Sequence, residues 1–147
     1  MDINRDAPAT AEGEVRIAAD TAIVWAVISD LEGWPTWNED IKTVQLKGTL
    51  GAGSVFEWKS GAASLTSTLG VVDPPNEIGW TGKTMGIRAV HIFRFESRDG
   101  ETLARSEESW EGLIASLLKG YSRRTLERGI QSFLGALKQE AERRTSM

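Results

Sequence analysis

The sequence predicts an α+β fold in which a curved antiparallel sheet of about seven strands wraps around one long C-terminal helix. Three observations predict it. After residue 38, short segments of alternating apolar and polar residues are separated by turn-forming residues, which indicates strands joined by hairpins. From about 113 to 143, apolar residues recur every three or four positions, as on one face of a helix. Two short helical segments come before most of the strands.

The beginning of the chain is expected to form no regular structure. Residues 1–11 are small and polar and include a proline, so we predict a disordered N-terminal segment. Residues 12–147 then form one domain, a usual size for a single hydrophobic core. Its first strand is predicted at residues 14–17, where the side chains alternate.

Two short helices follow the first strand. Asp20 is a good N-cap residue for a helix that ends near Asp30. A second helix is predicted to begin at Trp34, because Pro35 then occupies a first-turn position, where its missing N–H is not needed.

Six further strands are predicted between the short helices and the long one. Hairpin signals between them, such as Asp99-Gly100, indicate a meander in which each strand pairs with the next. They are expected at residues 42–46, 54–59, 63–72, around Ile78 and Trp80, at 86–97 and at 102–111.

A strongly curved sheet cannot pack its whole concave face against a helix about 10 Å across, so we expect a gap lined by aromatic side chains. The chain has six tryptophans, an unusual number for 147 residues. Plain core packing remains an alternative for each aromatic residue. The predicted ligand-binding residues of the sheet are Phe56, Trp58, Trp80, His91, Phe93, Glu108 and Trp110. The others are Trp37 and Trp34 beside a portal, Met85 in a turn over the opening, and Leu117 and Tyr121 on the long helix, facing the sheet.

His91 and Glu108 are the candidate catalytic residues if the protein is an enzyme. His91 shares the apolar face of its strand with Phe93, and it is interpreted as a core hydrogen-bonding group, a polar contact for a ligand or a general base. Glu108 is expected on the same face of the neighbouring strand, where a carboxylate needs a partner. A solvent-exposed or ion-paired Glu108 is the alternative, and a shift of register by one residue would turn Glu107 inward instead.

Composition excludes several classes of function. No cysteine is present and His91 is the only histidine, which excludes thiolate catalysis and multi-histidine metal sites. We expect no metal and no cofactor. A net charge of −4 disfavours nucleic acids and membrane surfaces as partners, and no segment is apolar enough for membrane insertion. A cytoplasmic protein is expected, and the oligomeric state, a dimer included, is left open.

Several spaced motifs resemble the START-like superfamily, also called SRPBCC, and especially its polyketide cyclase/dehydrase-like branch. They extend over roughly residues 12–143. The resemblance implies a helix-grip fold but leaves the function open, because the superfamily includes carriers, receptors, enzymes and co-chaperones. The residues that carry it are Ile17-Ala18-Ala19, Val24-Trp25, Asp30, Trp34-Pro35-Thr36-Trp37-Asn38, Gly53 before Phe56 and Trp58, Asp73-Pro74-Pro75 before Ile78 and Trp80, and Glu108-Ser109-Trp110-Glu111-Gly112.

Three functions therefore compete. The first is a carrier that binds an apolar or aromatic small molecule, lipid- or polyketide-like, in an internal cavity. The second is a cofactor-independent polyketide cyclase, aromatase or dehydratase, in which His91 moves the proton, Glu108 orients it and Tyr121 donates to a carbonyl. The third is a protein-interaction role such as chaperone activation. It requires an exposed apolar patch, which the sequence does not indicate.

Overall fold

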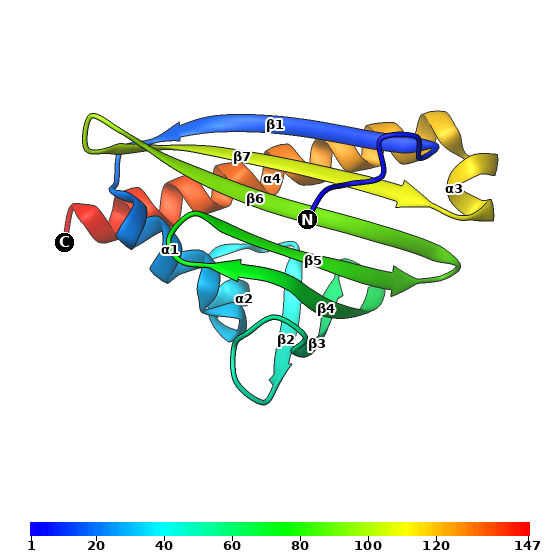
Figure 1. Ribbon diagram of the computed structural model, residues 1–147, viewed down its shortest axis with the longest axis horizontal. Helices are drawn as coiled ribbons and strands as arrows, with labels where there is room; N and C mark the ends of the chain where they lie inside the picture. Colours follow the sequence, from blue (N-terminus) through cyan, green and yellow to red (C-terminus); the bar gives the residue numbers. More distant parts are fainter.

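In the computed structural model, which describes all 147 residues, a seven-stranded antiparallel sheet curves around a long helix (Figure 1). The predicted fold class is confirmed. The strand order is β1-β7-β6-β5-β4-β3-β2, so β2 to β7 form a meander and β1 lies at the edge beside β7. The strands are β1 (Ala9–Ile17), β2 (Ile41–Lys47), β3 (Val55–Ser60), β4 (Ala63–Asp73), β5 (Glu77–Thr84), β6 (Ile87–Arg98) and β7 (Glu101–Glu111). The helical segments are α1 (Thr21–Ser29), η1 (Leu31–Gly33), α2 (Trp34–Trp37), α3 (Leu113–Leu117) and α4 (Lys119–Thr145).

The short helices begin where the sequence predicts. The Oδ1 atom of Asp20 accepts a hydrogen bond of 2.9 Å from the backbone N–H of Ile23, which caps α1. Pro35 lies in the first turn of α2. These local signals fix the path of the chain from β1 back to the far edge of the sheet at β2.

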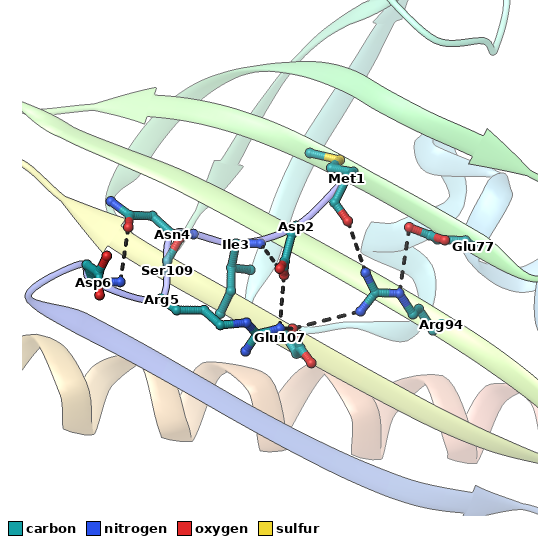
Figure 2. A network of polar contacts seen from close by, with 10 residues as sticks. All are labelled: Met1, Asp2, Ile3, Asn4, Arg5, Asp6, Glu77, Arg94, Glu107 and Ser109. Carbon is teal, nitrogen blue, oxygen red and sulfur yellow. Dashed lines mark hydrogen bonds and ion pairs between the residues drawn. The ribbon is translucent and has the colours of Figure 1, made fainter.

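The N-terminal residues are not the disordered segment that we expected. β1 begins within residues 1–11, and the residues before it cross the convex face of the sheet (Figure 2). Ile3 is buried there, and the Arg5 guanidinium pairs with the Glu107 carboxylate at 2.9 Å. Arg94 donates to the backbone carbonyl of the first residue at 3.0 Å. One apolar side chain and two arginine contacts therefore position a segment whose overall composition is small and polar.

Aromatic side chains pack together between α2, the concave face of the sheet and the middle of α4. Their ring centroids lie 4.9 to 6.5 Å apart, within or near the range typical of aromatic pairs. We call this group the aromatic cluster. It consists of Trp34, Phe56, Trp58, Trp80, Phe93 and Phe133.

The expected single C-terminal helix is two helices. Leu118, with φ −112° and ψ 42°, interrupts the helical path between α3 and α4. Leu117 is 72% exposed and Tyr121 is 63% exposed. Ser122 and Leu126 are the first sheet-facing residues of α4. The prediction that Leu117 and Tyr121 face the sheet is therefore wrong. Tyr121 lies about 180° around α4 from the buried Ile130, and Leu117 belongs to the separate helix α3.

The packing of α4 gives a first prediction. We expect Phe133→Ala to lower the free energy of unfolding by about 3–5 kcal/mol, because it leaves a cavity among rings that contact Phe133 from α2 and from the sheet. Tyr121→Ala, on the same helix but exposed, should change it by less than about 0.5 kcal/mol. Urea denaturation at neutral pH measures both values. Equal losses in the two variants would contradict the central position of Phe133.

Candidate ligand-binding site

The pairing of β6 with β7 brings three polar side chains together on the concave face. His91 lies opposite Glu108, and Phe93 lies opposite Ser106. The His91 Nε2 atom is 2.8 Å from the Ser106 hydroxyl oxygen, and its Nδ1 atom is 3.4 Å from a Glu108 carboxyl oxygen. One imidazole therefore stands between a hydroxyl and a carboxyl group. We call Ser106, His91 and Glu108 the polar triad.

The register that the sequence left open places Glu108 inward and Glu107 outward. Glu107 pairs with Arg5 on the convex face. Glu108 has no arginine or lysine partner, and its other carboxyl oxygen accepts a hydrogen bond of 3.0 Å from the Trp110 indole N–H. Adjacent glutamates thus differ completely in environment, as the two-residue period of a strand requires.

Burial controls the charge of the polar triad. It lowers the pKa of His91 to about 3, because the imidazolium form would lose its hydration among aromatic rings. It also raises the pKa of Glu108 to about 7, and the hydrogen bond from Trp110 opposes this rise. His91 is therefore neutral near pH 7, while Glu108 is close to half protonated. A carboxyl with such a pKa can either donate or accept a proton at neutral pH.

The concave face is closed at one end and open at the other. Beneath α2, the aromatic cluster is buried. Toward α3, the inward-facing side chains Ile87, Ala89 and Trp110 are only half-buried. The polar triad lies between these regions. Any guest from solvent would therefore reach the triad from the α3 end.

One polar atom in this region has no partner. The indole N–H of Trp37 is buried and makes no hydrogen bond, and its ring packs edge-on against Phe133 at 5.8 Å. An unsatisfied buried donor costs about 1–3 kcal/mol. An acceptor atom on a bound molecule would remove that cost.

The structure brings most of the predicted site residues together. Five of them are buried on the concave face and two lie beside them, half-buried. The buried residues are Phe56, Trp58, Trp80, His91 and Phe93, and the half-buried residues are Glu108 and Trp110. Their role in ligand binding remains a prediction.

Met85, expected over the opening, lies in the β5–β6 turn and is 75% exposed, and its role in ligand binding remains a prediction. Three other predicted positions are wrong. Leu117 and Tyr121 face solvent, as described above. Trp34 does not flank a portal either: it is fully buried, and its indole N–H donates to the carbonyl of Ile28 at 2.8 Å.

Two residues of the site were not recognised from the sequence. Ser106 fell on the same predicted face as Glu108, but only the register of β6 against β7 shows that it reaches His91. Phe133 followed the helical period, but nothing in the sequence distinguished it from other apolar residues of α4. Cross-strand pairing was the missing information for Ser106, and the position of α4 over the sheet was missing for Phe133.

Two hollows have volumes of about 650 and 490 Å³, and Ala89, which lines the smaller one, is the only residue that they share with the half-buried end of the concave face. The larger lies between the N-terminal segment, β1 and α4, and the smaller is lined by residues of β4 to β7. Neither is lined by any predicted ligand-binding residue. No three acidic or histidine side chains come close enough together to hold a metal ion.

The sequence model of the family described as polyketide cyclase/dehydrase and lipid transport matches residues 8–142, nearly the whole chain. The protein belongs to this family. No curated protein is significantly similar to it in sequence.

Solved structures with the helix-grip fold resemble this member of the polyketide cyclase/dehydrase family. A hypothetical protein of Helicobacter pylori has a TM-score of 0.81 at 16% identity, covering 95% of this chain and 91% of its own. The Zhui aromatase/cyclase of a Streptomyces species has a TM-score of 0.78 at 22% identity, covering 92% and 94%. A START superfamily protein of Mycobacterium smegmatis has a TM-score of 0.68 at 18% identity, covering 88% and 97%. At these identities the likeness establishes the fold.

The pKa values of the polar triad predict compensating effects of pH on stability. The raised pKa of Glu108 favours folding below pH 4.5, and this contribution is lost as pH rises through about 7. The lowered pKa of His91 favours folding above pH 6.5, and this contribution is lost as pH falls toward about 3. Between pH 4.5 and 6.5, His91 and Glu108 together hold one proton in both the folded and the unfolded protein. The two effects of pH on stability therefore cancel in this range.

Glu108→Gln should remove this cancellation while keeping the acceptor for Trp110. We compare the free energy of unfolding of the variant with that of the unmodified protein. The variant's advantage should be about 3 kcal/mol larger at about pH 8 than at pH 4.5. Urea denaturation across this pH range measures the difference. Glu12→Gln, which alters an exposed carboxylate, is the matched control. A Glu108→Gln difference that does not change with pH would contradict the raised pKa.

Proposed function

We propose that the protein binds an apolar or aromatic small molecule, lipid- or polyketide-like, between its sheet and α4. The observation that carries the proposal is the polar triad, an isolated group of polar atoms on an aromatic concave face. Burying a carboxyl that has no arginine or lysine partner disfavours its ionised form, and such groups concentrate at functional sites. An apolar surface with a few convergent polar atoms is the usual composition of a ligand site.

The half-buried side chains support a position of the ligand toward α3. The aromatic cluster occupies the α2 end, so a ring compound has to lie against Ala89 and Trp110 or displace Phe133. In the second case an acceptor on the ligand would reach the Trp37 N–H, which lacks a partner and lies against Phe133. Either position also places the ligand beside Glu108 and His91.

Family membership supports the same class of ligand, since the family description includes both polyketide cyclases and lipid transport. A cytoplasmic location, which the composition suggested, is part of the proposal. No helix of the structure is long and apolar enough to cross a membrane.

Narrowing the open end should weaken binding. Ala89 faces inward, opposite Trp110, and Ala89→Phe adds a ring where the ligand is proposed to lie. Overfilling a site costs about 1–3 kcal/mol, so we expect the affinity for 2-naphthol, a two-ring probe, to fall about ten-fold or more. Quenching of tryptophan fluorescence measures the affinity.

Val90→Phe is the matched control, because it adds the same ring to the opposite face of β6. It should leave 2-naphthol binding unchanged. Equal effects of both variants, or no detectable binding of 2-naphthol and of lipids extracted with the purified protein, would contradict the proposal.

A cofactor-independent cyclase or dehydratase is the second candidate, and the polar triad favours it. His91 is neutral near pH 7, the form that a general base requires. Its lowered pKa also makes it a weak base, so in this function the ionised form of Glu108 has to stabilise the imidazolium when His91 takes the proton. In this function Glu108 orients the imidazole and Ser106 holds its other nitrogen. The role predicted for Tyr121 is ruled out by its exposure, and the Ser106 hydroxyl is the nearest alternative donor on the concave face.

The catalytic candidate predicts a large effect at one residue. If His91 transfers the proton, His91→Ala should lower turnover of a linear poly-β-ketothioester about 10²–10⁴-fold. Product formation is measured by mass spectrometry, and thermal denaturation confirms that the variant is folded. Unchanged turnover in a folded variant would remove His91 as the acid–base group while leaving the carrier function possible.

A further inference from the structure

The end of the molecule around α3 exposes a group of large apolar side chains. Leu113 and Leu117 are 73% and 72% exposed, and lie on the side of α3 opposite the buried Ala115. The β5–β6 turn adds Met85 at the same end, where the next residue, Gly86, lies beside Ile114 (Figure 1). We call the exposed side chains at this end the apolar surface. It consists of Met85, Leu113, Leu117, Leu118 and Tyr121.

The apolar surface has a fixed base. The backbone of Gly112, with φ +118°, packs so closely against the carbonyl of Gly86 that a Cβ atom there would collide with it. The start of α3 is therefore held against the β5–β6 turn. The exposed side chains of α3 and Met85 consequently stand at one defined end of the protein.

Positive charge follows directly along α4. Residues 113–131 contain four cationic side chains and a single acidic one, in a chain whose net charge is −4. All four cations are exposed and none forms an ion pair, whereas most arginines elsewhere are paired. We call them the basic stripe: Lys119, Arg123, Arg124 and Arg128.

Tyr121, Arg124 and Arg128 are separated by three and four positions, so they lie along one line on the outer face of α4, whereas Lys119 and Arg123 project from another side of the helix. Helices that bind lipid surfaces typically combine apolar side chains, which enter the interfacial layer, with arginine or lysine side chains.

We propose that the apolar surface and the basic stripe dock the protein on an anionic lipid bilayer. The apolar side chains of α3 and Met85 enter the interfacial layer, and the basic stripe contacts lipid phosphates. Net charge alone disfavours such contact, but Glu127 is the single acidic residue within residues 113–131. The inference goes beyond the proposed function, because it concerns docking on a membrane and not the ligand site. Vesicle binding therefore tests it independently of 2-naphthol binding.

Binding to vesicles tests the proposal. Unmodified protein should co-sediment with vesicles of phosphatidylcholine and phosphatidylglycerol, and much less with phosphatidylcholine alone. Arg124→Gln with Arg128→Gln should lower the partition coefficient about thirty-fold, because each cation near an anionic surface contributes about a five-fold increase. Leu113→Ser with Leu117→Ser should lower it about ten-fold or more. Raising the salt concentration should weaken binding of the unmodified protein.

The control is Lys42→Gln with Lys47→Gln, which removes the same charge from exposed, unpaired lysines on β2. It should change vesicle binding less than about two-fold. The Arg124/Arg128 variant should bind 2-naphthol normally, so a loss of vesicle binding is distinguished from a loss of ligand binding.

Four results would overturn the proposal. These are absence of binding to anionic vesicles, equal binding to neutral ones, an equal loss in the Lys42/Lys47 control, and binding that survives both patch variants. Two other occupants would be revealed by different outcomes. Dimerisation that Leu113→Ser with Leu117→Ser abolishes in sedimentation experiments would assign the surface to a second copy. Poly-glutamate binding as tight as vesicle binding, and insensitive to the leucine changes, would assign it to an acidic polypeptide.

Discussion

The structure depends on the way one side chain of α4, Phe133, joins three parts of the fold. It is the only aromatic residue that α4 contributes to the interior, and its ring contacts Trp34 of α2, Trp80 of β5 and Phe93 of β6. A curved sheet and a straight helix have few common contact points, so a large ring at the centre fills more of the gap than aliphatic side chains can. The aromatic cluster therefore sets the distance between α4 and the sheet.

That distance also sets the properties of the polar triad. His91 contacts Trp80, Phe93 and Phe133, so the rings that fix α4 also exclude water from the imidazole. The strand period then decides which glutamate shares this environment. Glu107, one residue away, points to the convex face and is neutralised by arginines, whereas Glu108 has none. Its raised pKa is thus a direct consequence of strand register and aromatic packing.

The features that short-range sequence patterns determine were predicted correctly. Alternation gave the strands, Asp20 gave the start of α1, and Glu108 was placed inward, although the register remained open. Prediction failed at the start of the C-terminal helical region. Leu118 separates α3 from α4 with no proline or capping residue to mark the interruption. Tyr121 was assigned to the wrong side because it was grouped with the apolar residues of α4, although it lies about 180° around the helix from Ile130. Ser106 was missed as a partner of His91 because cross-strand contacts require the register of two strands.

The two ends of the sheet therefore serve different physical purposes. At the α2 end, burial of Trp34 and Phe56 supplies stability, and a guest there would have to replace contacts between rings. At the α3 end, Leu113 and Leu117 are exposed, so the hydrophobic stabilisation of about 1.5–3 kcal/mol that burial of each large side chain provides is not gained. Their exposure beside the open end of the concave face fits a protein that exchanges an apolar ligand with a surface at that end.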